Sequence, residues 1–535
     1  MIPLNVPFSA LKGRALFSLI FFTSPGLVAA ENSATQTKKT TDETMTVVAD
    51  GSRQSATNGY QPVNTSTATL TTMPMLDIPQ VVNTVSEQVL EDQHATNLDE
   101  ALYNVANVVQ TNTLGGTQDA FSRRGFGANR DGSIMTNGLR TVLPRSFTAA
   151  TERVEVLKGP ASTLYGILDP GGLINVVTKR PERSFGGSVS ATSTSFGGGS
   201  GQFDVTGPID GTPLAYRVIG EYQHEDYWRN FGKQKTSFIN PSLTWFGERA
   251  TVNVSYSHRN YSTPFDRGTI FDLNTGHAVN VDRKTRFDEP FNITDGYSDL
   301  AQLNAEYRLS DAWTARFDYS YSQDHYNDDQ ARVMAYDSAT GNLTRRVDAT
   351  HGSTQKMHAT RADLQGNVVI GGFYNEILTG LAYENYDLLR TDMIRCKNVK
   401  GFNIYNPVYG TLDKCSSVSA SDSDQRTQQE SYAGYVQDAL YLSDKWIAIA
   451  GVRYQYYTQY AGKGRPFNVN TDSSDQKWTP KAGLVYKLTP SVSLFGNVAQ
   501  SFMPQSSIAS YIGNLPPEES TSYELGAKFD LFNGV

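Results

Sequence analysis

This 535-residue sequence lacks long apolar runs and an excess of positive charge. Its mean hydropathy is -0.42, and 19% of its residues are charged. Beyond the first 30 residues, no stretch approaches the roughly 20 consecutive apolar residues that a membrane-spanning helix needs, so a helical membrane protein is excluded. The net charge of -8 argues against a nucleic-acid partner, because no basic stripe is present to bind phosphates.

Motifs for metal binding and for hydrolytic catalysis are also missing. The seven histidines are scattered. Neither a His-Glu-x-x-His pattern nor a cysteine cluster occurs, so we expect no metal centre built from protein ligands. No Gly-x-Ser-x-Gly pattern or similar set of nucleophile and base stands out. The sequence therefore does not predict an enzyme.

Aromatic residues, in contrast, are abundant. They make up 11% of the chain and include 29 Tyr and 25 Phe. A high tyrosine content with much glycine and little sustained hydrophobicity is typical of a transmembrane β-barrel, in which only every other residue of a strand faces lipid. A soluble array of β-sandwiches has a similar composition, so composition alone leaves both folds open.

The first 30 residues have the pattern of a secretory signal peptide. Lys12 and Arg14 form a basic start, residues 15–27 form a short apolar core, and small residues precede the expected cleavage site. Export places the chain in an oxidising compartment. There the only two cysteines, Cys396 and Cys415, are expected to form a disulfide that staples a polar loop. Two free thiols are the alternative.

Residues 31–64 predict a flexible tether. They are dominated by Thr, Ser, Gln, Asp and Gly and hold too little apolar surface to fold alone. A short β-prone patch near residues 42–49 interrupts this tether. Such a patch suits addition as a strand to the sheet edge of a partner protein, although an ordinary extended linker has the same pattern.

Residues 65–181 and 186–535 follow different patterns and predict two domains. The first range mixes short strands with helical segments, such as residues 97–109, where apolar residues share one helical face. It indicates a compact α+β domain. The second range has long strands of period two, and residues 313–322 are an example. Charged residues recur on the polar face of strand after strand, which suits a water-filled lumen.

Connections between the strands of the second domain alternate in length. Short turns such as residues 309–311 and 443–445 alternate with long segments at 263–296, 391–424 and 503–518. Outer-membrane barrels have short periplasmic turns and long outer loops. We therefore predict an antiparallel membrane β-barrel, with about 14 strands present in this chain.

Three runs in the first domain resemble the plug domain of TonB-dependent siderophore receptors. They are residues 121–127 (FSRRGFG), 152–166 (ERVEVLKGPASTLYG) and 170–181 (PGGLINVVTKRP), in the order and spacing of that family. Residues 516–526 of the barrel resemble the same family. The resemblance covers nearly the whole chain, and it implies that the α+β domain is a plug inside the lumen of the barrel.

This resemblance implies an outer-membrane receptor of a Gram-negative bacterium that imports a ferric siderophore. The patch before the plug then resembles a TonB box, the strand that TonB, acting with ExbB and ExbD, pulls to supply energy. Assembly of such a barrel implies the barrel-assembly machinery as a further partner. Iron is carried within the siderophore, so no cofactor is expected. The residues of the box are Glu43, Thr44, Met45, Thr46, Val47 and Val48.

Specific contacts are implied as well. The plug residues Arg124 and Lys158 match positions that pair with acidic groups on the inner wall of the barrel, and Glu524 is one such acid; a solvent-exposed charge is the alternative. Candidate siderophore contacts lie on plug loops that face outward and at the barrel mouth. These candidates are Thr113, Leu114, Arg140, Arg145, Tyr227, Trp228, Phe265 and Tyr326.

The strand count departs from the family, whose barrels close with about 22 strands. A plug of about 115 residues is roughly 35 Å wide. A closed cylinder of 14 tilted strands is only about 28 Å wide, whereas one of 22 strands is about 44 Å wide. We therefore expect a C-terminally truncated receptor whose residues 186–535 form an incomplete barrel, and a non-functional fragment is one alternative.

The ligand class is predicted from two outer segments. Residues 263–268 and 286–292 are similar to receptors of the ferrichrome, coprogen and ferrioxamine group, and the expected disulfide loop fits that group. Hydroxamate is therefore the expected ligand class, followed by catecholate. A haem or cobalamin receptor of the same fold is a further alternative. A passive porin would lack both the plug and the box.

Overall fold

The computed structural model describes residues 4–7, 59–127, 132–508 and 515–531. Within this part of the chain, fourteen long antiparallel strands form one curved sheet, as the sequence predicts. No helix there is long and apolar enough to cross a bilayer. The fourteen strands are β11 (Gly186–Ser193), β12 (Gly198–Pro208), β13 (Leu214–Asp226), β14 (Lys233–Phe246), β15 (Ala250–Pro264), β18 (Ile293–Arg308), β19 (Trp313–Asp337), β20 (Asn342–Ile370), β21 (Phe373–Arg395), β23 (Gln425–Tyr441), β24 (Trp446–Lys463), β25 (Asn468–Thr489), β26 (Val492–Met503) and β27 (Glu518–Phe529).

Short strands flank the large sheet. β1 (Leu4–Pro7) pairs with β11, and β22 (Val399–Asn403) pairs with the outer end of β20. β16 (Phe271–Asp272) and β17 (His277–Ala278) form a separate hairpin. The strands of the large sheet follow one another along the chain, because each is joined to its neighbour by a hairpin connection.

Period-two alternation decides which side chains face outward and which face the lumen. On β19, the ring of Phe317 is 40% exposed on the outer face. The next residue, Asp318, faces the lumen and accepts a hydrogen bond from Arg361 at 2.8 Å. The same parity places Ser320 and Ser322 inside, fully buried. Apolar surface therefore faces outward and polar groups line the interior, as expected for a membrane barrel.

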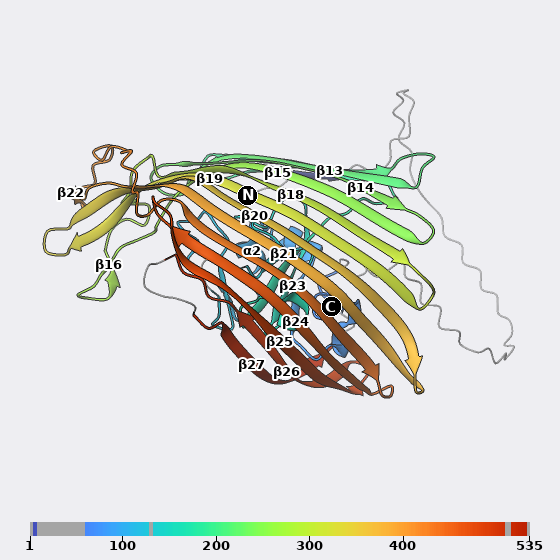
Figure 1. Cartoon of the computed structure of the whole chain (residues 1–535). Coiled ribbons are helices and arrows are strands. Elements are labelled where there is room, and N and C mark those ends of the chain that lie inside the picture. The colour runs from blue at the N-terminus through green and yellow to red at the C-terminus, as the bar shows by residue number, and fades with distance from the viewer. Residues whose placement is uncertain (1–3, 8–58, 128–131, 509–514, 532–535) are drawn as a thin grey trace, which may run out of the picture.

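The connections at one end of this sheet are all short turns, and the long loops lie at the other end. Short turns connect the strands at residues 309–312, 371–372 and 442–445, whereas residues 265–292 and 396–424 are long loops at the other end. Because outer-membrane barrels carry their long loops outside, we call the end with the long loops the outer end. β19 and β20 extend beyond their neighbours there, next to β16 and β22 (Figure 1).

The plug is built around a five-stranded sheet of order β4-β9-β10-β7-β8. Its two longest strands form the centre of the sheet and are almost entirely buried. The plug elements are β2 (Asn64–Thr65), β3 (Met73–Pro74), the 3-10 helix η2 (Met75–Asp77), β4 (Val82–Val85), α1 (Glu87–Asp92), α2 (Leu98–Ala101), β5 (Val108–Gln110), β6 (Phe121–Arg123), β7 (Ile134–Thr136), β8 (Leu139–Arg140), β9 (Thr151–Lys158), α3 (Ser162–Tyr165) and β10 (Gly172–Thr178).

The helix expected over residues 97–109 is much shorter than its apolar pattern suggests. Asn97 caps it by accepting from the amide of Glu100, but the α-helix α2 ends at Ala101. Asn107 adopts a left-handed backbone (φ 60°), which a helix cannot continue through. Val109 then lies on strand β5 and is 62% exposed. Turns at residues 102–107, and from Val108 the pairing of β5 with β6, therefore replace the last two turns of the expected helix.

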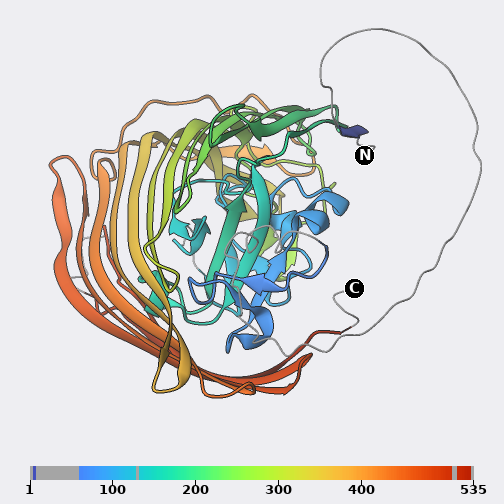
Figure 2. The ribbon, with the colours of Figure 1, turned by 90° about the vertical axis from the view of Figure 1, so that its right-hand side faces the viewer.

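The plug lies on the concave side of the curved sheet, which wraps around it as an arc (Figure 2). The path of paired strands is linear, from β1 to β27. An open arc resolves the size conflict found in the sequence, because it can surround a plug that a closed cylinder of 14 strands would not hold. An apolar cluster joins the two parts: Leu70 and Ile78 of the plug pack with Ile449, Val485 and other wall residues.

Candidate functional site

A cavity of about 140 Å³ opens at the outer end, between a plug loop and the barrel wall. The plug contributes a single loop residue, and the long loop after β15 contributes another. The remaining lining comes from the outer ends of β19, β20 and β21, which are neighbours in the sheet. The lining residues are Leu114, Arg267, Asp328, Gln330, Arg332, Asp348, Thr350, Arg390, Met393 and Arg395.

Positive charge dominates this cavity. Four arginines line it against two aspartates, which leaves two positive charges in excess. Arg267 donates to the side-chain oxygen of Gln330 from Nε at 3.1 Å and from Nη2 at 2.5 Å. Arg390 donates from Nη1 to the side-chain oxygen of Gln425 at 3.1 Å. Because both acceptors are neutral amides, the two guanidinium groups keep charge available for an anion.

The other two arginines have loose carboxylate partners. Arg332 Nη1 lies 3.6 Å from Asp348 Oδ2, and Arg395 Nε lies 3.7 Å from Asp422 Oδ2. Asp348 is held more closely by Arg346, whose Nε lies 2.6 Å from its Oδ1. A carboxylate-bearing ligand can therefore compete for Arg332 and Arg395 without breaking a tight ion pair.

A bulge interrupts the pairing of β19 with β20 near the cavity, between Tyr326 and Asp328. Gly352 adopts a left-handed backbone (φ 71°), which glycine allows at little cost. From β21, Thr391 donates from its hydroxyl to the carbonyl of His351 at 2.8 Å. Below the bulge Ser353 is buried against the lumen, and above it Thr350 lines the cavity. The side-chain parity of β20 thus changes by one residue at Gly352.

The plug reaches the cavity through the loop between β5 and β6. Leu114 and Gly115 both adopt left-handed backbones, with φ of 49° and 68°. The loop docks on the barrel, since the amide of Asp266 donates to the carbonyl of Gly115 at 2.8 Å. A Cβ on Gly115 would lie only 2.6 Å from the ring of Phe265. Plug loop and outer barrel loop therefore form one packed unit beside the cavity.

A buried ion pair holds the long outer loops together. Glu289 is 0% exposed, and its Oε1 accepts from Arg345 Nη2 at 2.7 Å. Its Oε2 accepts from the amide of Gly410 at 2.5 Å. Arg345 also stacks over the ring of Phe402, at 3.9 Å from the guanidinium carbon to the ring centroid. Residues 265–292, which carry Arg267, are thereby fastened to the loop that follows β21.

The neighbouring carboxyl of Asp288 has an unusual proton affinity. Burial raises the pKa of the Asp288 carboxyl to about 6, although the Arg286 guanidinium lies 2.7 Å away and favours the ionised form. Desolvation penalises a buried charge, and here it exceeds the effect of the nearby cation. The docked loop therefore holds a group that titrates between the ordinary aspartate range and neutral pH.

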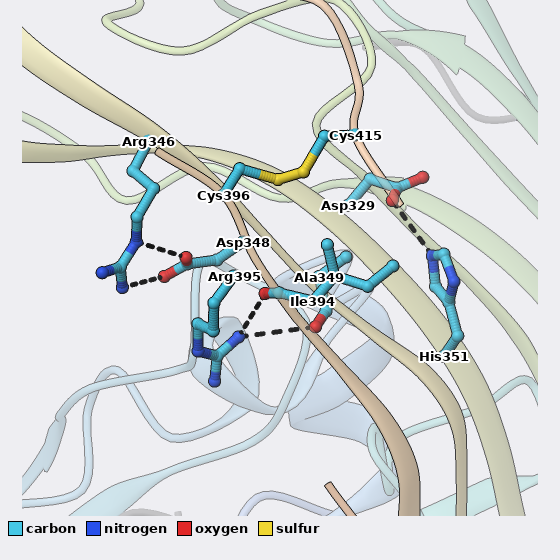
Figure 3. Close-up of a disulfide and its surroundings, with 9 residues drawn as sticks. All are labelled: Asp329, Arg346, Asp348, Ala349, His351, Ile394, Arg395, Cys396 and Cys415. Atoms are coloured by element: carbon cyan, nitrogen blue, oxygen red, sulfur yellow. Dashed lines mark hydrogen bonds and ion pairs between the residues drawn. A yellow bond between two sulfur atoms is a disulfide. The ribbon is translucent and has the colours of Figure 1, made fainter. Parts of the chain in front are cut away.

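A disulfide between Cys396 and Cys415 fixes the loop after β21 (Figure 3). Cys396 directly follows Arg395 of the cavity, and its amide donates to the carbonyl of Val347 at 3.0 Å. Next to Cys415, at the other end of the disulfide, Lys414 forms an ion pair with Asp329 at 2.6 Å. The covalent link therefore constrains the backbone that presents Arg395 to the cavity.

The candidate ligand contacts named from the sequence have different surroundings. Of the eight, Leu114 lines the cavity. Thr113 accepts from the amide of Gly116 and shapes the plug loop. Arg140 donates to the carbonyl of Ile167, and Arg145 pairs with Asp119 at 2.9 Å.

The four aromatic candidates are not among the lining residues, although the Phe265 ring lies 5.1 Å from the guanidinium carbon of Arg267. Tyr227 donates to Asp266 at 3.1 Å, and Trp228 is 41% exposed. Phe265 and Tyr326 are buried, at 0% and 3% exposure. Phe265 instead packs against the plug loop at Gly115.

The residues expected to link plug and barrel are brought together at one point. Arg124 Nη2 donates to Glu524 Oε1, so a plug residue forms an ion pair with the wall strand β27. Glu524 also accepts from Asn497 at 3.2 Å. Lys158 stands close by; burial and the neighbouring Arg124 lower the pKa of its ammonium, and Glu524 opposes this shift.

Residues 43–48, the candidate TonB box, and residues 8–30 of the candidate signal peptide lie outside the described residues. In the described part of the chain, no three His, Cys, Asp or Glu side chains gather as a metal-binding group.

The arginines of the cavity were missed by sequence reasoning. Arg267 lies inside the segment that resembles hydroxamate receptors, and Arg395 stands next to a cysteine. A useful signal would have been a cluster of arginines at strand ends that precede long loops, because those ends meet at the barrel mouth. Arg390 and Arg395 follow this pattern at the end of β21, whereas Arg332 precedes the short turn between β19 and β20.

Comparisons with known protein families cover both domains. Residues 237–534 match the family described as "TonB dependent receptor-like, beta-barrel". Residues 74–173 match "TonB-dependent Receptor Plug Domain". The barrel match alone covers more than half of the chain.

Individual relatives agree with these matches. The metal-pseudopaline receptor CntO of Pseudomonas aeruginosa is 30% identical over 505 residues, covering 92% of this chain and 70% of that protein. The ferrioxamine B receptor of Salmonella typhimurium is 25% identical over 497 residues, covering 88% and 67%. Among solved structures, BauA, the ferric preacinetobactin receptor of Acinetobacter baumannii, superposes with a TM-score of 0.79 at 21% identity, covering 89% of this chain and 72% of that chain.

Proposed function

The chain belongs to the TonB-dependent receptor family, and from that premise we propose that it captures a negatively charged metal chelate in the arginine-lined cavity. Receptors of this family lie in the outer membrane, bind siderophores or other metal carriers, and are energised by TonB. The chain is thus a receptor and transporter rather than an enzyme. The metal is cargo held by its chelator, so the protein itself needs no metal ligands.

The charge of the cavity supports an anionic ligand most strongly. Arg267 and Arg390 donate to neutral amides, and a guanidinium presents paired donors that match a carboxylate. Exclusion of water strengthens such contacts, because the electrostatic attraction rises as the local dielectric falls. The CntO likeness concerns a receptor for a metal-pseudopaline complex and supports a metal carrier as the cargo.

A hydroxamate siderophore is the second candidate. It is favoured by the similarity of residues 263–268 and 286–292 to hydroxamate receptors, and the ferrioxamine B receptor is one relative of the chain. The two ligand classes differ in charge. Binding of an anionic chelate requires the arginines, whereas binding of an uncharged hydroxamate complex depends on them much less.

Binding measurements on arginine variants separate these ligands. The double change Arg267→Gln and Arg390→Gln should weaken binding of a polycarboxylate gallium chelate by at least about 100-fold, because each lost charged hydrogen bond is worth about 1.5–3 kcal/mol. Arg426→Gln is the matched control, since Arg426 pairs with Asp387 away from the cavity lining. Equal loss in the control, or no loss in the double variant, contradicts the anionic assignment.

Energy coupling is proposed to use the box at residues 43–48. Residues 1–30 serve as the signal peptide, the barrel-assembly machinery inserts the barrel, and TonB with ExbB and ExbD pulls the box by adding it as a strand to the sheet edge of TonB. All main-chain hydrogen bonds of such a strand share the load. Deleting residues 44–48 should abolish uptake of radiolabelled metal and leave binding to whole cells unchanged. Uptake at the normal rate after the deletion removes this coupling assignment.

A further inference from the structure

The first segment of the plug, residues 64–80, lies between the plug sheet and the inner wall of the barrel; we call it the entry segment. On its plug side, the hydroxyls of Thr65 and Thr67 donate to the carboxylate of Glu155 on β9. The phenol of Tyr165 donates to the carbonyl of Thr67 at 2.8 Å. The entry segment thus forms a separate layer over the central strands of the plug.

On its other side, three lysines of the barrel wall hold the entry segment. Lys481 of β25 donates to the carbonyl of Ala68 at 3.4 Å. Lys528 of β27 donates to the carbonyls of Met75 and Ile78, at 2.7 and 2.6 Å. The acceptors are main-chain oxygens, so these ammonium groups recognise the backbone of the segment rather than its side chains.

Further wall contacts follow the same segment. Lys487 lies 2.7 Å from the carboxylate of Asp77. Two amides complete the set: Gln437 donates to the carbonyl of Thr69 at 3.0 Å, and Asn497 donates to that of Pro79 at 2.5 Å. Donors from β23, β25, β26 and β27 therefore all end on the entry segment. A cavity of about 20 Å³ already lies between the segment and this wall.

The entry segment directly follows the predicted tether, so a pull from TonB reaches it before any other part of the plug. Main-chain layers that pack face to face are about 10 Å apart. Withdrawal of the entry segment alone would therefore open a slot about 10 Å wide between plug sheet and wall. It would also leave the lysines of the wall without their acceptors, and a buried unpaired ammonium is strongly disfavoured.

We propose that the inner wall of β23 to β27, uncovered when the entry segment is withdrawn, is a transit site for an anionic metal chelate. This inference rests on the proposed function. Carboxylate oxygens of the chelate replace the carbonyl oxygens of the segment on Lys481 and Lys528, and they replace the Asp77 carboxylate on Lys487. When the chelate leaves, the same donors draw the segment back. Of the acidic groups near this wall, Glu524 is paired with Arg124, and Glu376 accepts from Tyr441 at 3.0 Å.

Cysteine labelling tests this site without knowledge of the ligand. Val485 of β25 is 0% exposed and packs in the cluster beneath the entry segment. The full chain with Val485→Cys is produced in its energised, metal-limited host. It is treated with an anionic sulfonatoethyl or a cationic trimethylammonioethyl methanethiosulfonate. We expect labelling only when TonB and the membrane potential are present, with the anionic reagent about tenfold faster, because a basic cleft concentrates anions.

Matched variants give the assay its controls. Ser443→Cys lies in an exposed turn at the inner end. Its labelling rate measures how fast each reagent enters the periplasm, and the rates at Val485→Cys are divided by it. Ile174→Cys, in the core of the plug sheet, should stay unlabelled, because only the entry segment leaves. Adding Lys481→Met and Lys528→Met should reduce the anionic preference at Val485→Cys to less than about twofold. Lys→Arg at both positions should restore it.

Three results would overturn the inference. They are an unlabelled Val485→Cys in cells that take up metal normally, equal labelling of Ile174→Cys, or a preference that survives both methionine substitutions. Each of these leaves the proposed function standing. Absence of metal uptake through the unmodified chain is a separate result and counts against the proposed function instead.

Discussion

Neutralising Glu289 tests how firmly the outer loops are held beside the cavity. Its carboxylate is fully buried and accepts from Arg345 at 2.7 Å and from the amide of Gly410 at 2.5 Å. Glu289→Gln keeps the size of the side chain and one acceptor oxygen. It removes the negative charge, however, and leaves the Arg345 guanidinium buried without its carboxylate.

The expected cost follows from the contacts that remain. Removing one partner of a buried ion pair costs about 3–5 kcal/mol. Arg345 still donates to the carbonyls of Phe287 and Asp288, each at 3.3 Å, and still stacks on Phe402. We therefore expect the lower end of the range, about 3 kcal/mol. Because each 1.36 kcal/mol is a tenfold change, the population of opened loops should rise about 150-fold.

Native-state hydrogen exchange, followed by mass spectrometry on the purified protein in detergent, measures this change. Amides of residues 286–292 and of Gly410 should exchange faster in Glu289→Gln by about two orders of magnitude, because they open with the loop. Amides of the plug strand β9 are the internal reference and should keep their protection, since they lie in a separate core. Faster exchange throughout the plug would mean global destabilisation instead.

A double variant separates charge from packing. Glu289→Gln combined with Arg345→Met removes both charges, and well-packed neutral replacements of buried ion pairs are often tolerated. Exchange in the double variant should therefore return to within about tenfold of the unmodified protein. Two results would refute the claim that the Glu289–Arg345 pair holds the loops together. One is a rise of less than about threefold in the exchange rates of Glu289→Gln, and the other is a double variant that exchanges as fast as Glu289→Gln.

Three further predictions concern nearby groups. Docking of the loop that carries Asp288 should be more stable at pH 5 than at pH 7.5. The folded pKa of Asp288 is raised to about 6, so this stability is lost as the pH rises from about 4 through 6. Asp288→Asn should abolish this pH dependence of the loop's protection against hydrogen exchange. Replacing Cys396 and Cys415 with serine should lower loop stability by about 3 kcal/mol, the scale for a closed loop of this length, and limited proteolysis should then cut the loop. Arg124→Met should lower plug stability by about 1–3 kcal/mol by stranding Glu524; thermal unfolding should show restoration when Glu524→Gln is added.

Much of the fold could be predicted because it depends on local pattern. Alternation of polar and apolar residues fixes which face of a strand meets lipid, and turn residues fix where each strand ends. The structure accordingly has fourteen barrel strands in its described residues, as expected. The three plug segments within residues 121–181 that resemble the family contain the residues of their own turns. The one-turn helix α2 departs from expectation, because it ends at Ala101, and the left-handed backbone of Asn107 then directs the chain into strand β5.

The cavity could not be predicted, because its lining depends on register and on bulges. Leu114 and Arg395 are far apart in sequence and meet only once the plug is seated against β21. The bulge at Gly352 also shifts the parity of β20. Odd-numbered residues such as Ser353 face the lumen on its inner side, and even-numbered residues such as Thr350 do so on its outer side. A strict period of two therefore assigns Asp348 and Thr350 to the wrong face. The sequence also does not show how far along a strand the cavity lies, because β20 is 29 residues long.

The chain carries a net negative charge, whereas the cavity inside it carries an excess of positive charge. Only the charge of the interior bears on the ligand. The sequence carries -8 overall, which would repel an anion at long range, but salt screens exposed charges within about 10 Å. Inside, Arg267 and Arg390 donate to neutral amides, while Lys481 and Lys528 donate to main-chain carbonyls. Such acceptors can be exchanged for those of a ligand without separating an ion pair. Local donors of this kind, rather than the average charge, decide which chelate can bind at the mouth and pass along the wall.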